Sequence, residues 1–243
     1  MTNNLKLTAV IAVVAVVGAI VAVYYLSNPT TPRSSNISPV EGAVSQAELD
    51  RATASLKSAI NTADQLSGTT GANFTFQAQP TYGHYANFGV VQNVNEVKSV
   101  GLVDEMAITF SGKTDNDNAE VDPKTGQVVA FHRDIDYNST AKEKTQAEIE
   151  SAVRTFLNTV YPNFKQVEPT LAFAPGMKGV RLNNGNYFFS WEDENYQKQL
   201  PAGVTTDRQP FIQVGITSNG FIFSYNNTID LYRNALKEFS VTQ

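Results

Sequence analysis

The chain contains no cysteine and only two histidines among its 243 residues. Without cysteine there is no disulfide, no thiolate nucleophile, no cysteine-ligated metal site and no lipid anchor attached to a thiol. A hydroxyl nucleophile needs a neighbouring base, and the only imidazoles are those of His84 and His132. We interpret both as exposed or strand-end residues, because His84 lies in a polar-aromatic loop and His132 ends the first predicted hairpin. The chain also lacks the Gly-x-Ser-x-Gly nucleophile elbow. Nucleophilic catalysis therefore has little support in the sequence.

The glycine-rich loops that bind phosphate in nucleotide-binding proteins are also absent. The most metal-like stretch is residues 115–122, which is similar to a calcium-binding loop through Asp115, Asp117 and Asp122. Such a loop needs glycine at its sixth position and glutamate at its twelfth, where this chain has Glu120 and Gly126. We therefore expect a solvated acidic loop, and we predict no metal, no cofactor and no catalytic residue.

Positive charge is scarce, since 18 basic residues face 23 acidic ones and give a formal net charge of −5. The basic residues form no cluster. A mildly acidic surface repels phosphate backbones and anionic lipid headgroups. The composition therefore excludes nucleic acid as a partner.

One long uncharged run lies near the N-terminus, at residues 7–26. Twenty residues at about 1.5 Å per residue span a hydrocarbon core of roughly 30 Å. A cleaved signal peptide would have a shorter apolar region, of about 7–15 residues, and a small-x-small cleavage site. Here the run ends instead at Tyr24, Tyr25 and Leu26. We expect a retained single-pass anchor, with residues 1–6 as a short cytoplasmic tail and the rest of the chain outside the cell membrane.

Residues 27–44 are rich in proline, serine and threonine, and this composition predicts a flexible linker between the anchor and the folded part. Asn-x-Ser/Thr sequons begin at Asn36, Asn73, Asn138 and Asn226. These sequons fit an exported chain, and the sequence leaves open whether they are glycosylated.

From residue 45 onward, a helical pattern followed by a group of strands occurs twice. Ser45 with Glu48, and Thr145 with Glu148, form capping boxes that mark helix starts 100 residues apart. Apolar residues recur at helical spacing after each box, so each helix has one face made to lie on a sheet.

Short segments rich in phenylalanine, valine and isoleucine follow each helix and are separated by turn-forming residues. The predicted strands are 73–79, 85–94, 105–112, 119–122 and 127–134 in the first group, and 169–175, 186–194, 209–217 and 221–227 in the second. Each group contains a turn that closes on glycine, Gly126 or Gly220, and we expect both at positive φ between antiparallel strands. A final helix is predicted at residues 229–239.

Together these patterns predict an α+β fold of two tandem units, each with one amphipathic helix packed on an antiparallel sheet. A single N-terminal transmembrane helix precedes them. The first unit would cover residues 45–138, and the second would cover residues 139–243 and include the C-terminal helix.

The repeated unit resembles the PepSY-like superfamily, and among its forms the tandem YcdB/YcdC or YPEB-type repeats, over about residues 45–228. The shared motif is a strand ending in Asp-x-x-Thr-Gly-x-hydrophobic. It is matched by Asp122, Thr125, Gly126 and Val128 in the first copy, and loosely by Asn219, Gly220 and Ile222 in the second. The resemblance implies an extracytoplasmic, often membrane-anchored module that modulates envelope peptidases or binds other envelope components. It brings no catalytic residues.

We therefore predict a non-enzymatic binding or regulatory protein that is anchored in the membrane and contacts a protein or peptide partner in the envelope through an exposed sheet edge. One alternative is an envelope hydrolase or carbohydrate-active enzyme that uses a solvated acidic rim at Glu192, Asp193 and Glu194. Another is a structural cell-surface protein.

Overall fold

The computed structural model describes residues 44–68, 77–93, 96–112, 117–134, 142–174, 186–206 and 209–241. Within these ranges no helix has the length and apolar character needed to cross a membrane. The predicted anchor at residues 7–26 lies outside them, as does the linker up to residue 43, so the anchor stays a prediction. The chain from Ala43 to Gln243 forms one compact unit.

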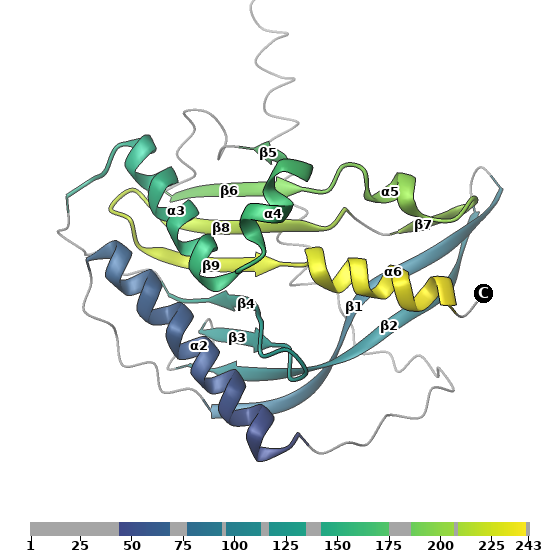
Figure 1. The fold of residues 1–243 in the computed structure, drawn as a ribbon, viewed down its shortest axis with the longest axis horizontal. Helices are drawn as coiled ribbons and strands as arrows, with labels where there is room; N and C mark the ends of the chain where they lie inside the picture. Colours follow the sequence, from purple (N-terminus) through teal and green to yellow (C-terminus); the bar gives the residue numbers. More distant parts are fainter. Residues whose placement is uncertain are drawn as a thin grey trace, which may run out of the picture. The chain divides into compact units, whose positions relative to one another are not determined.

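The strands of the described residues form a single sheet in the order β5-β6-β8-β9-β4-β3-β2-β1-β7 (Figure 1). The first four are β1 Gln77–Asn93, β2 Glu96–Ser111, β3 Asn118–Val121 and β4 Val128–His132. The others are β5 Ala172–Ala174, β6 Asn186–Glu192, β7 Val204–Thr206, β8 Phe211–Thr217 and β9 Ile222–Asn227. Every neighbouring pair is antiparallel.

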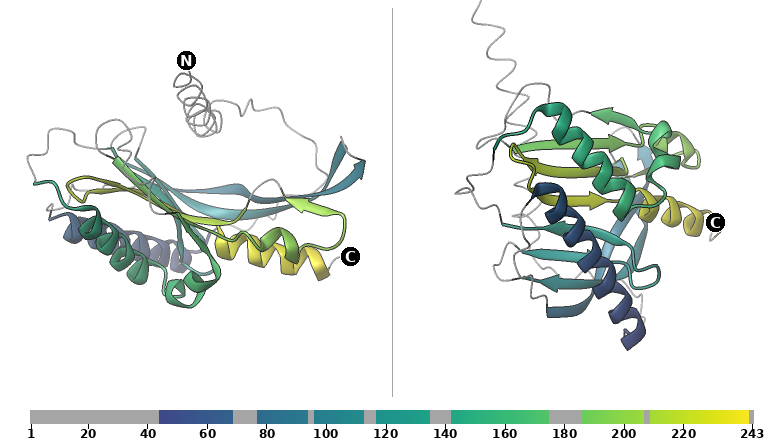
Figure 2. Two further views of the ribbon diagram at one scale, coloured as in Figure 1. Left: turned by 90° about the horizontal axis from the view of Figure 1, so that it is seen from above. Right: turned by 60° about the vertical axis from the view of Figure 1, so that its left-hand side comes forward.

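Three longer helices lie on the same face of this sheet, as Figure 2 shows: α2 Gln46–Ser67, α3 Gln146–Val160 and α6 Ile229–Val241. Shorter helical segments follow α3 and β6: α4 Phe164–Val167, the 3₁₀ turn η1 Glu168–Thr170 and α5 Tyr196–Gln199. Both predicted capping boxes are confirmed, at the starts of α2 and α3. The predicted C-terminal helix is also confirmed, as α6.

The prediction of two tandem helix-on-sheet units is wrong. Strand β4 of the first half pairs with β9 of the second, with Phe131 opposite Tyr225, and the sheet continues across this junction. Strand β7, also from the second half, pairs with β1 at residues 88–90. The physical reason is that each group of strands has an edge with unpaired backbone groups, and joining the edges satisfies both. The structure therefore has one continuous sheet where two separate sheets were predicted.

The two glycine turns agree with the sequence prediction even though the units do not. Gly126 has φ +74° between β3 and β4, and Gly220 has φ +94° between β8 and β9. The segments predicted as separate strands at 73–79 and 85–94 differ from the structure, because their described residues belong to the single strand β1. A register shift between His84 and Ala86 lets this strand bend without leaving its partner β2.

The hydrophobic core lies between the sheet and the helices, and its centre is the β4–β9 junction. Phe156 of α3 is fully buried, and its ring packs edge-on against Phe131 of β4 and Tyr225 of β9, with ring centres 5.9 and 5.6 Å away. Leu56 of α2 is buried in the same cluster. Residues from both halves of the chain therefore share one core.

A buried ion pair fastens one end of the junction. Arg133, which directly follows β4, is only 2% exposed and donates to Asp64 of α2 across 2.6 Å. Its Nε also donates to the carbonyl of Ile222 on β9 (3.1 Å), and its guanidinium lies 4.4 Å from the centre of the Phe221 ring. Burial lowers the pKa of Arg133, and the contact with Asp64 opposes that shift. One side chain thus ties α2, β4 and β9 together.

Candidate functional site

A cleft of about 710 Å³ lies on the helix-bearing face of the sheet, where four parts of the chain meet. Its walls come from the middle of α2, the β3–β4 turn, the C-terminal end of α3 with the residues that follow it, and α6. The first two belong to the first half of the chain and the last two to the second half. The cleft is therefore a product of the continuous sheet.

The β3–β4 turn forms a rigid part of the wall because its side chains bond their own backbone. The Asp122 carboxylate accepts the backbone N–H of Lys124 (2.8 Å) and the hydroxyl of Thr125 (2.7 Å). The Thr125 hydroxyl accepts the backbone N–H of Gln127 (3.2 Å). These bonds are those of an Asx turn, in which an aspartate side chain replaces a backbone acceptor.

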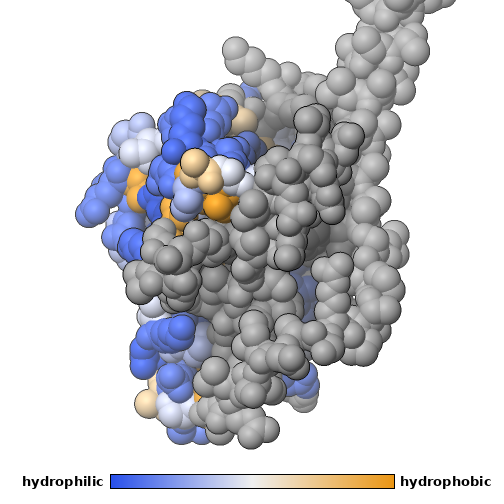
Figure 3. Space-filling view, turned by 90° about the vertical axis from the view of Figure 1, so that its right-hand side faces the viewer, coloured by the Kyte–Doolittle hydropathy of each residue, from blue (hydrophilic) through white to orange (hydrophobic). Residues whose placement is uncertain are grey.

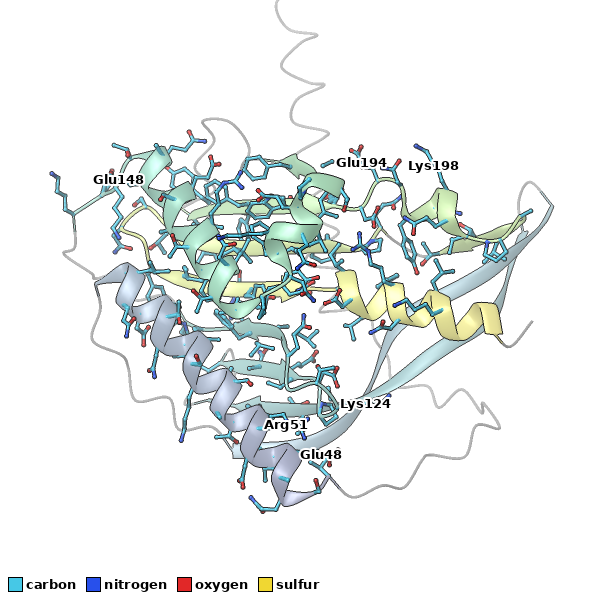
Figure 4. The ribbon with its side chains drawn as sticks, in the orientation of Figure 1. Glu48, Arg51, Lys124, Glu148, Glu194 and Lys198 are labelled. Carbon is cyan, nitrogen blue, oxygen red and sulfur yellow. The ribbon has the colours of Figure 1, made fainter. Side chains whose placement is uncertain are left out.

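This turn is also fastened to α2. Arg51 donates from Nη1 to the carbonyl of Lys124 across 2.7 Å, and Figure 4 shows Arg51 beside the turn that carries Lys124. A methyl group at Gly126 would lie only 2.8 Å from Cγ and Cδ of Arg51. Two features therefore favour glycine at position 126: its positive φ and the close approach of the Arg51 side chain.

A hydrogen bond between the end of α3 and the start of α6 forms the opposite part of the cleft. Tyr161 caps α3 through its N–H to Leu157, and its hydroxyl donates to Oδ1 of Asp230 across 2.9 Å. Burial, followed by the negative charge of Asp230, raises the pKa of Tyr161 above its usual range. The hydroxyl is therefore protonated at neutral pH and remains a donor.

The inner end of the cleft contains a polar group without a partner. Asn227 lines the cleft and is 1% exposed; its Oδ1 accepts the N–H of Ile229, whereas its Nδ2 has no hydrogen-bond partner. The Tyr225 hydroxyl, two residues earlier on the same face of β9, is also buried without a partner. Burial raises the pKa of Tyr225, and its interaction with the Asn227 side chain lowers it, so these two buried groups lie close to each other. Neither atom is accessible from the cleft, so both contribute to the fold beneath it and not to ligand contact.

Most residues that the sequence singled out lie elsewhere. His132 is half-buried on β4, with its ring 6.1 Å from that of Phe223, while the side chain of His84 and all of Asp115 lie outside the described residues. Asp117 accepts the backbone N–H of Asp134. Asp122 lines the cleft together with the other residues of the turn motif, Thr125, Gly126 and Val128. Among the described residues, no three histidine or acidic side chains are grouped so that they could hold a metal ion.

The prediction of a solvated acidic rim at residues 192–194 is wrong for its central residue. Asp193 is 2% exposed, and its Oδ2 accepts from Arg233 of α6 across 2.9 Å. Glu192 and Glu194 are exposed, and none of the three lines the cleft. In Figure 4, Glu194 lies near α5, away from Arg51 and Lys124. Asp193 therefore anchors α6 to β6 instead of forming a catalytic rim.

The sequence did not predict the cleft, because the residues that line it come from segments far apart in the chain. The nearest signals were the Asp-x-x-Thr-Gly turn and Asn227 shortly before the helical pattern, because an asparagine side chain commonly accepts a nearby backbone N–H. The contact of Tyr161 with Asp230 spans 69 residues and has no local signature.

The chain has no significant match among family models, curated proteins or solved structures. The resemblance to PepSY-like repeats therefore stays a prediction. Arguments about function rest on the cleft itself.

The turn gives a testable prediction with an internal control. Gly126→Ala and Gly203→Ala both place a side chain at positive φ, +74° and +81°, but only at Gly126 does the new methyl group collide with another residue. Displacing Arg51 breaks its bond to Lys124, so we expect Gly126→Ala to lower the free energy of unfolding by about 1 kcal/mol more than Gly203→Ala. Urea denaturation of both variants measures the difference. Equal losses of unfolding free energy would contradict a role of Arg51 in holding the turn.

The acidic segment gives a second prediction. Asp193→Asn removes the buried carboxylate that pairs with the partly exposed Arg233, and we expect a loss of about 1–3 kcal/mol in unfolding free energy. Glu192→Gln and Glu194→Gln are the matched controls, because both side chains are exposed and should change stability by less than about 0.5 kcal/mol. The anchoring role is wrong if all three variants unfold at the same urea concentration.

Proposed function

We propose that the chain is a non-enzymatic binding protein that holds an extended segment of a peptide or protein partner in the cleft. The observation that supports this is the lining, in which nine of the nineteen residues carry a hydroxyl or amide group and come from several separate elements. A polypeptide main chain offers one donor and one acceptor per residue, and such side chains can pair with both. The volume of about 710 Å³ lies within the range of ligand sites, roughly 300–1,000 Å³.

The surface chemistry supports the same mode of binding. In the side view of Figure 3, the described surface is mainly hydrophilic, with hydrophobic side chains only in small groups. A stable apolar interface would need a broad hydrophobic patch. On the face that Figure 3 shows, recognition by hydrogen bonds fits the described residues better than an apolar interface does.

An enzyme that uses paired carboxylates is the competing class, because Asp122 and Asp230 both line the cleft. However, the Asp122 carboxylate is engaged by Lys124 and Thr125 in the turn, and Asp230 accepts the Tyr161 hydroxyl. Among the described residues that line the cleft there is no histidine. The turn uses both oxygens of Asp122, and one oxygen of Asp230 is bonded to Tyr161. No pair of unengaged carboxylates is therefore left for acid–base work, and this favours binding over catalysis.

The cleft also fits a peptide better than the predicted sheet edge does. The two strands at the ends of the sheet, β5 and β7, have only three residues each. Strand β1 is covered by β7 only at residues 88–90, and its uncovered part carries Pro80, which has no N–H to donate to an added strand. We further propose that the cleft faces the outside of the cell, a proposal supported by the uncharged run at residues 7–26.

The proposal is tested by photocrosslinking in intact cells that make the full chain. A photoreactive amino acid at Ser58, an exposed residue of α2 on the cleft wall, should give a covalent adduct with a polypeptide partner. The same amino acid at Lys198, exposed on α5 and outside the cleft lining, is the control and should not give it.

A second variant links the adduct to the cleft. Asn234→Trp places a bulky ring in the cleft from the α6 side and should abolish the Ser58 adduct while the protein stays folded. Equal adducts from Ser58 and Lys198, or a Ser58 adduct that survives the tryptophan, would contradict the proposal.

A further inference from the structure

The two helical walls of the cleft differ in charge. Helix α6 lines the cleft with Asp230, Asn234 and Lys237, which are spaced four and three residues apart and so lie on one side of the helix. Helix α2 opposes them with the small, uncharged residues Ser55, Ser58 and Ala59. Charge recognition in the cleft therefore belongs to α6, together with the fixed turn at Asp122.

The charges on α6 are ordered along the helix. Asp230 is half-buried in its first turn, Asn234 is neutral, and Lys237 is exposed toward its C-terminal end. Neither charged group forms an ion pair with another described residue; the neighbouring Arg233 is paired with Asp193 instead. A negative and a positive group are thus both open to a ligand on the same wall.

The distance between these charges can be compared with a peptide. Seven residues of helix at about 1.5 Å per residue place Asp230 and Lys237 roughly 10 Å apart along the axis. An extended peptide advances about 3.3–3.6 Å per residue, so about three residues cover this distance. Asn234 lies between the two charges, where its amide can meet a main-chain group.

Building on the proposed binding function, we infer that the cleft selects an extended peptide with a cationic group at Asp230 and an anionic group three residues away at Lys237. The Tyr161 hydroxyl holds Oδ1 of Asp230 in place, which keeps the carboxylate oriented toward the cleft. A neutral oligosaccharide would leave both charges of α6 without a counter-charge, and the peptide is therefore favoured.

The test uses the purified full chain in detergent and a set of fluorescent hexapeptides with blocked ends. Each hexapeptide carries one lysine and one glutamate, separated by one to five positions in either order, among alanine and serine. We expect the tightest binding, measured by fluorescence anisotropy, at a separation of three and in only one of the two orders. Higher salt should weaken this binding, because the charges lie in an open cleft.

Substitutions then test which charged residues of α6 contribute to peptide binding. Lys237→Glu should weaken binding of the preferred peptide by about two- to fivefold, since the lysine is exposed, whereas Lys198→Glu on α5 should leave it unchanged. Asp230→Asn keeps an acceptor for Tyr161 but removes the negative charge, and should weaken binding by about tenfold. This variant should also remove the advantage of the lysine-containing peptides over peptides with glutamine in its place.

The possible failures are distinguishable. If the Ser58 crosslink forms but affinity is independent of charge spacing, or if Lys237→Glu and Lys198→Glu behave alike, the charge inference is overturned and the binding function stands. If no hexapeptide binds, the Ser58 crosslink is absent and a neutral chito-oligosaccharide binds the cleft, both the inference and the proposed function are overturned.

Discussion

Strand β4 comes from the first half of the chain and β9 from the second, and the hydrogen bonds between them are the constraint on which the other features depend. Through this pairing, strands of both halves join one antiparallel sheet. Phe156 covers the junction from α3, and Arg133 closes its end by contacting α2 and β9. Breaking the junction would expose both strand edges and a large part of the core.

The cleft follows from the same pairing. Its walls on α2 and the β3–β4 turn are built by the first half, and its walls at the end of α3 and on α6 are built by the second. Each wall is fixed by its own contacts: Arg51 holds the turn, Tyr161 holds the start of α6, and Asp193 holds Arg233 farther along α6. Two separate units would have no such site, because neither contains all four walls.

Features encoded by residues close together in the chain were predictable. The capping boxes at Ser45 and Thr145, the glycine turns at Gly126 and Gly220, and most strand positions depend on patterns within a few residues. The joining of the two groups of strands was not predictable, because the alternation of apolar and polar residues does not say which edge a strand will pair with. Similarly, the acidic run around Asp193 predicts exposed side chains, because nothing near it in the sequence indicates that Arg233, 40 residues later, lies beside it.

The most direct test of the single-sheet account is equilibrium unfolding followed by one probe in each half. Trp191, the only tryptophan, is fully buried on β6 and reports on the second half through its fluorescence. Because the chain has no cysteine, a fluorophore at Lys57→Cys on the exposed side of α2 reports on the first half alone. If β4 and β9 join the halves into one cooperative structure, both probes should change at the same urea concentration in a single transition. Two transitions, in which one probe changes while the other remains native, would show that the halves fold separately and would contradict the account.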